Sequence, residues 1–196
     1  MPVYIAAVKC PSCGSPIEGI TGDRVFLCQC GVLHTRDDLG TRELHHIIAS
    51  PKSPTAPPGS IVFVPFWRLD SQVTIHHQRS EGGWLHKIFG KDWRGGRMCI
   101  FVPAMDWDPN TYKQMASTLT KSPPPIHPAT SFGPYERWPV TIEEGEAAAL
   151  ADFMILTFEA EKPGVLQEIS FDVRVLGSSL IYFPFDRSRG ALKPFF

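Results

Sequence analysis

The chain has no long hydrophobic run and almost no net charge, and each absence removes a class of protein. Its 19 Lys and Arg residues nearly balance 20 Asp and Glu, which gives a formal net charge of −1 and a pI near 6.6. That balance argues against a chain devoted to nucleic acid, so any basic surface must be local. No apolar stretch approaches the ~20 residues of a membrane-spanning helix. We therefore predict no membrane span.

The common catalytic signatures are also missing. The sequence contains no GxSxG, HExxH or GxGxxG motif, which removes the usual marks of a hydrolase nucleophile, a zinc protease and a dinucleotide site. We therefore predict that the protein is not an enzyme.

Cysteine is scarce, and most of it stands in one place. Four of the five cysteines form two close pairs within the first 30 residues, a pattern unlike a secreted disulfide framework. Residues 1–8 lack the basic segment typical of a secretion signal. We expect a reducing, cytoplasmic setting. The remaining thiol, Cys99, is flanked by apolar residues and is predicted to be inert core.

The two cysteine pairs are candidates for one metal site. Cys10 and Cys13 form a CxxCG segment, and Cys28 and Cys30 form a CxCG segment after a hairpin-length interval. A glycine after each pair permits a backbone conformation that a Cβ would obstruct. Tetrahedral thiolates at zinc lie roughly 3.8 Å apart, whereas residues i and i+2 of an extended strand stand roughly 6.5 Å apart. Either the chain tightens between Cys28 and Cys30, or His34 replaces Cys30 as the fourth ligand.

This layout resembles the zinc-ribbon and rubredoxin-like CPxCG proteins over about residues 8–36. The resemblance implies one bound metal ion, with Zn²⁺ as the first expectation and iron as the alternative, because four thiolates suit both metals. These families serve transcription, translation, electron transfer and scaffolding. The resemblance therefore implies a site and leaves the function open.

Composition divides the chain into three parts. Residues 49–60 hold four prolines and no aromatic residue, which is typical of a stiff linker. We predict a zinc ribbon with a short helix (35–48) over residues 1–48, the Pro-rich linker over 49–60, and an α+β domain over 61–196.

The α+β domain is expected to contain a mainly antiparallel sheet with two or three helices. An acidic N-cap at Asp108 and proline at the next position predict a helix through Thr120. A capping box from Thr141 to Glu144 predicts a second helix to about Asp152. Strands are predicted over 61–67, 72–76, 98–103 and 153–159, with a hairpin of 166–176 and 179–185 around Gly177-Ser178.

Basic and aromatic side chains concentrate in the loop 82–96 and at the C-terminus. Such side chains suit protein interfaces and single-stranded bases, although aromatic residues of this kind also fold back on a core. The predicted partner-binding residues are Trp84, Lys87, Phe89, Lys91, Trp93, Arg94, Phe195 and Phe196.

Taken together, these patterns favour a non-enzymatic zinc-ribbon protein that acts as a protein-binding adaptor or as an accessory subunit of a larger complex. A nucleic-acid-associated factor using the ribbon and the basic aromatic loop is the alternative. A rubredoxin-like electron carrier is the third hypothesis.

Overall fold

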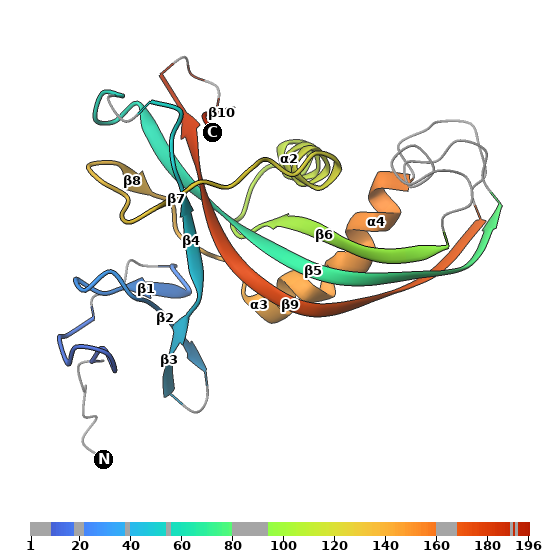
Figure 1. Cartoon of the computed structure of the whole chain (residues 1–196), viewed down its shortest axis with the longest axis horizontal. Coiled ribbons are helices and arrows are strands. Elements are labelled where there is room, and N and C mark those ends of the chain that lie inside the picture. The colour runs from blue at the N-terminus through green and yellow to red at the C-terminus, as the bar shows by residue number, and fades with distance from the viewer. Residues whose placement is uncertain are drawn as a thin grey trace. The chain divides into compact units, whose positions relative to one another are not determined.

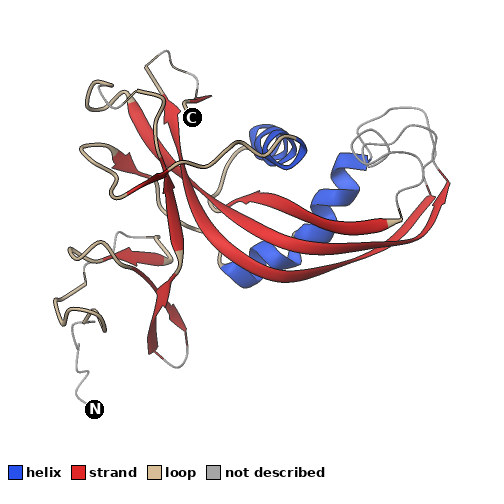
Figure 2. Cartoon of the chain, viewed as in Figure 1, coloured by secondary structure: helices blue, strands red, loops and turns tan. Residues whose placement is uncertain are grey.

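The computed structural model describes residues 9–17, 22–37, 40–53, 56–79, 94–159, 168–188, 190 and 192–196 (Figure 1). In this part of the chain, Figure 2 shows both helices and strands. They form a three-stranded antiparallel sheet and a mainly antiparallel seven-stranded sheet with three helices. The predicted α+β class is therefore confirmed.

The chain divides into two compact units. Unit 1 contains residues 1–65, 126–141 and 180–196, and unit 2 contains residues 66–125 and 142–179. The predicted linker 49–60 is not where these units part. The described backbone of this stretch is hydrogen-bonded within unit 1. The N–H of Ser50 donates to the carbonyl of His127 (2.7 Å), and the N–H of Lys52 donates to the carbonyl of Phe195 (2.9 Å).

The small sheet in unit 1 has the strand order β1-β2-β3, with β1 at Val25–Leu27, β2 at Leu33–Asp37 and β3 at Gly40–Leu44. The helix predicted over 35–48 is wrong, because that stretch forms β2, β3 and β4 (His46–Ala49). Its weak helix propensity is overridden by backbone pairing with neighbouring strands.

The larger sheet has the order β6-β5-β9-β4-β7, with β10 paired to β9 and β8 paired to β5. Its strands are β4, β5 (Ile61–Arg79), β6 (Gly95–Pro103), β7 (Pro128–Ala129), β8 (Glu136–Arg137), β9 (Glu168–Asp186) and β10 (Lys193–Pro194). The β4–β9 and β5–β8 pairs are parallel, whereas β5–β6, β4–β7 and β9–β10 are antiparallel.

Two predictions of short strands are corrected by this sheet. The segments 61–67 and 72–76 belong to the single strand β5. The described part of the predicted hairpin, residues 168–185, belongs to the single strand β9 (Glu168–Asp186). A two-residue hairpin turn needs positive φ, and Gly177 is not among the glycines with positive φ. The Gly177-Ser178 pair therefore continues the strand.

The three helices among the described residues lie in unit 2. Helix α2 (Pro109–Lys121) begins as predicted, because the Asp108 carboxylate accepts from the backbone N–H of Thr111 at 3.0 Å. Helix α3 (Glu144–Ala149) has Glu143 as its N-cap, two residues after the predicted N-cap Thr141, and the Glu146 carboxylate accepts from the backbone N–H of Glu143.

Helix α4 (Ala151–Glu159) replaces the strand predicted over 153–159. Ala151, Met154 and Ile155 are buried, and their spacing places them on one face of a helix. The run of apolar residues made this segment ambiguous in the sequence, and its buried face follows the helical period.

Candidate metal centre

Two similar turns carry the four clustered cysteines. In the first turn, the N–H of Gly14 donates to the carbonyl of Cys10 at 2.8 Å, and in the second, the N–H of Gly31 donates to Cys28 at 2.9 Å. Both glycines have positive φ, 75° and 86°, as the sequence predicted. The second turn is one residue shorter, yet it closes in the same way because Gln29 lies in the turn and not in a strand.

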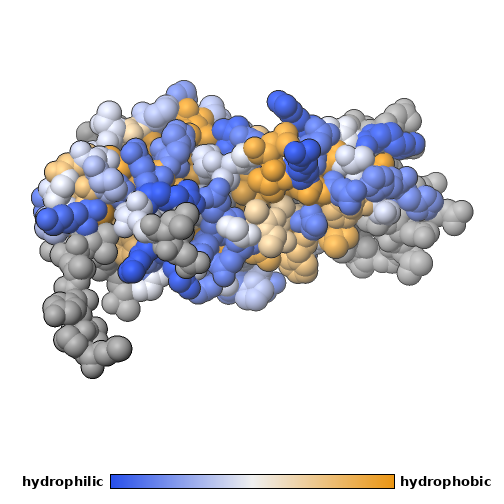
Figure 3. All heavy atoms as spheres, turned by 90° about the horizontal axis from the view of Figure 1, so that it is seen from below, coloured by the Kyte–Doolittle hydropathy of each residue, from blue (hydrophilic) through white to orange (hydrophobic). Residues whose placement is uncertain are grey.

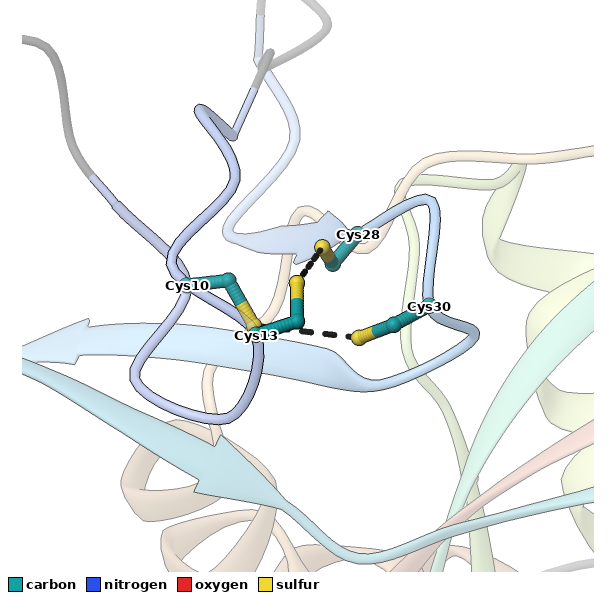
Figure 4. A group of neighbouring side chains, drawn as sticks. All are labelled: Cys10, Cys13, Cys28 and Cys30. Atoms are coloured by element: carbon teal, nitrogen blue, oxygen red, sulfur yellow. Dashed lines mark hydrogen bonds between the residues drawn. The ribbon is translucent and has the colours of Figure 1, made fainter.

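The four sulfur atoms meet between these turns. Figure 4 shows the side chains of Cys10, Cys13, Cys28 and Cys30 pointing toward one another. The Cys10–Cys30 sulfurs are 3.8 Å apart and the Cys13–Cys28 sulfurs 3.5 Å, and all four lie within 4.8 Å of one another. Thiolates bound tetrahedrally to zinc stand roughly 3.8 Å apart, so this cluster fits one metal ion.

The surroundings shift the pKa values of two of the clustered thiols in opposite directions. Hydrogen bonds from Ser15 lower the pKa of Cys13 to about 6. The Cys30 backbone N–H favours the Cys28 thiolate, but burial and the neighbouring cysteines outweigh it and raise the pKa of Cys28 to about 12. Thiolates this close repel one another unless a metal ion neutralises them. The donor set therefore suits a thiophilic metal.

His34 lies beside the cluster but outside the four-sulfur group. Among the residues that the structure describes, the group that could hold a metal contains the four cysteines alone. The His34 side chain is fully buried, and its Nε2 atom lies 3.2 Å from the Cys10 sulfur. The Cys30 sulfur therefore belongs to the four-sulfur group, and His34 contacts that group through Cys10.

A buried ion pair fixes the cysteine-bearing segment within unit 1. The Asp23 carboxylate accepts from the Arg137 guanidinium at 2.7 Å, and their side chains are 0% and 9% exposed. The same carboxylate accepts from the backbone N–H groups of Val25 (3.1 Å) and Val140 (2.9 Å). Arg137 also donates to the Tyr182 hydroxyl at 2.9 Å. No local pattern in the sequence predicts this contact, because 114 residues separate the two charges.

Most of the predicted partner-binding residues lie outside the described parts of the chain, namely Trp84, Lys87, Phe89, Lys91 and Trp93. Arg94 is exposed, and its carbonyl accepts from the N–H of Ile75 at 3.1 Å. The ring of Phe196 packs against Phe183, with centroids 4.6 Å apart. The backbone N–H of Phe195 donates to Pro184 at 2.9 Å.

Cys99 is partly exposed, so its prediction as a core residue is wrong. Its thiol donates to the Asp70 carboxylate at 3.0 Å, and the Arg68 guanidinium donates to the same carboxylate at 3.0 Å. Burial, followed by the hydrogen bond to Asp70, raises the pKa of Cys99. This thiol lines a pocket of about 520 Å³ in unit 2, together with Asp70, Ser71, Arg97, Met98, Leu176 and Gly177.

No helix within the described ranges is both long and apolar enough to cross a bilayer. Comparison of the whole chain with protein-family models, curated proteins and solved structures finds no match.

Proposed function

We propose that this is a non-enzymatic zinc-ribbon protein that acts as a protein-binding adaptor or accessory subunit. The observation that carries the proposal is the convergence of four sulfurs within 4.8 Å. Four thiolates complete a tetrahedral shell, and a closed shell is typical of structural zinc, whereas catalytic zinc keeps a position for water. The metal would then hold the two cysteine turns together.

Zinc is preferred to iron because a redox centre needs an electron partner, and nothing in the sequence points to one. Elemental analysis of the purified full chain should give one zinc ion per molecule in a colourless protein. A red-brown protein with stoichiometric iron would favour the electron-carrier alternative, since four thiolates also hold iron. A chain without stoichiometric metal would contradict the proposed centre.

The protein-binding part of the proposal rests on helix α4. The described large hydrophobic side chains with high exposure are Phe153 (60%), Leu156 (46%) and Leu176 (48%). Phe153 and Leu156 are three residues apart on α4, opposite its buried face. Figure 3 shows hydrophobic side chains gathered on the face that is seen from below. Helices that are apolar on both faces are normally covered on both, and aromatic side chains are typical anchors of protein interfaces.

Affinity capture with matched variants tests this part. We compare the parent, the double variant Phe153→Ser with Leu156→Ser, and the control Asp152→Asn on the same helix. The same protein should be recovered by the parent and the control but lost by the double variant, while all three melt alike. Equal recovery by the double variant would contradict binding through α4. Loss of the captured material after nuclease treatment would favour the nucleic-acid alternative.

A further inference from the structure

His34 lies beside the metal centre without belonging to its four-sulfur group. It lies on β2, where it pairs with Phe26 on one side and Glu43 on the other, and its side chain is 0% exposed. Fully buried polar side chains are normally hydrogen-bonded. The ring makes one such contact, from Nε2 to the Cys10 sulfur at 3.2 Å, and Nδ1 has no partner among the described residues.

This contact decides where the proton of a neutral imidazole lies. A neutral ring carries one N–H donor and one acceptor nitrogen. If the proton were on Nδ1, the Nε2 lone pair would face the electron-rich Cys10 sulfur and a buried donor would have no acceptor. With the proton on Nε2, an N–H group faces the sulfur, and Nδ1 is left as an acceptor without a hydrogen bond. An unpaired acceptor costs less than an unpaired donor. The second arrangement is favoured whenever Cys10 is a thiolate.

We propose that His34 is a positioning residue of the metal centre and donates an Nε2–H hydrogen bond to the Cys10 thiolate. This inference rests on the proposed metal centre and adds a residue beyond the four ligands. Cys10 is 1% exposed, so bulk water has little access to its sulfur.

The hydrogen bond would act in two ways. It disperses negative charge from one of four thiolates that together exceed the charge of a divalent metal by two, and hydrogen bonds to a charged acceptor favour the charged form. It also fixes the direction of the Cys10 side chain. Partners that orient metal ligands typically change metal affinity by about 10- to 100-fold when they are removed.

Three variants of the full chain separate this role from simple packing. His34→Gln keeps a long side chain with an N–H donor, His34→Asn carries the same amide on a shorter stem, and His34→Leu fills the space without a donor. Each variant is loaded with zinc, its metal content and circular dichroism are compared with those of the parent, and the rate of zinc transfer to a coloured chelator is measured. Alkylation of Cys10 by iodoacetamide, followed by mass spectrometry, provides a second readout.

We expect zinc transfer from the Leu and Asn variants to be about 10- to 100-fold faster than from the parent, with Cys10 alkylated sooner than Cys13, and the Gln variant to resemble the parent. If the Leu variant does not fold, the Gln and Asn pair carries the test. Equal transfer rates in the parent, Gln and Asn variants would overturn the inference while leaving the metal centre intact. A parent that holds no metal would overturn the centre itself, and the role of His34 with it.

A cobalt-substituted sample tests the remaining alternative, in which His34 is a ligand. Four sulfur ligands and three sulfurs with one nitrogen give different visible spectra because the ligand field differs. The spectrum of His34→Gln should match that of the parent, and Cys30→Ser should alter it. The proposal would be overturned if His34→Gln changed the spectrum and Cys30→Ser left it unchanged.

Discussion

Neutralising Asp23 should destabilise the protein far more than neutralising an equivalent surface carboxylate. Asp23→Asn preserves shape but turns an amide N–H₂ group toward the Arg137 guanidinium, or toward the two backbone donors that the carboxylate now accepts from. Removing one partner of a buried ion pair costs about 3–5 kcal/mol, because the other charge stays buried without its partner. For a chain of this length, that loss corresponds to a fall in Tm of about 6–20 °C.

The chain offers a matched control for this change. Glu136 accepts from Arg187 at 2.7 Å, the same distance as in the Asp23–Arg137 pair, but the two side chains are 51% and 36% exposed. Exposed pairs contribute about 0–1 kcal/mol, so Glu136→Gln should change the melting temperature little. Urea unfolding and thermal melts of both variants, in the metal-loaded full chain, provide the comparison.

A second substitution checks that the effect belongs to the pair. If the charge of Arg137 is what the Asn variant leaves uncompensated, adding Arg137→Met should recover part of the loss, and the two changes should be non-additive by 0.5 kcal/mol or more. Equal effects of Asp23→Asn and Glu136→Gln would refute the reasoning. Strict additivity of the two buried changes would refute it as well.

Three further predictions follow from the packing and the pKa directions. Phe196→Ala should cost about 1–3 kcal/mol in urea unfolding because its ring packs on buried rings of β9; an unchanged stability would favour a free docking role for this residue. Ile155→Ala, on the buried face of α4, should lower the free energy of unfolding by about 2–5 kcal/mol. An unchanged midpoint in a thermal melt would contradict this. Cys99 should react with iodoacetamide more slowly than a free cysteine at pH 8, because its raised pKa leaves less thiolate. Since Asp70 raises that pKa and Arg68 lowers it, Asp70→Asn should speed the reaction and Arg68→Met should slow it, and changes of the opposite sign would contradict this reading.

The parts of the structure that the sequence predicted are those with local causes. The cysteine turns depend on residues within five positions of one another, and both glycines have the positive φ that was expected. The start of α2 likewise depends on Asp108 and the proline that follows it. In each case, the group that satisfies the backbone lies within a few positions of it in the chain: a carbonyl in the cysteine turns and the Asp108 carboxylate at α2.

The errors arose where distant pairing decides the local structure. Residues 35–48 are strands because β2 pairs with β1 and β3, and β4 pairs with β9. The 153–159 segment is apolar in both helical and strand registers, so its pattern could not decide between them. The Gly177-Ser178 pair is typical of a turn, but it lies within β9. The Asp23–Arg137 pair was invisible for the same reason, since no local pattern links two charges that lie 114 residues apart.

The cysteine turns and the buried ion pair act on opposite ends of one short strand. β1 has three residues, with Asp23 two positions before it and Cys28 directly after it. A strand this short has little apolar surface to bury, so its position must be held by other means. Asp23 holds one end through Arg137, and a metal bound by Cys28 would hold the other. Because both anchors lie in unit 1, we expect the cysteine-bearing segment to fold as part of that unit and not as a separate module joined by a passive linker.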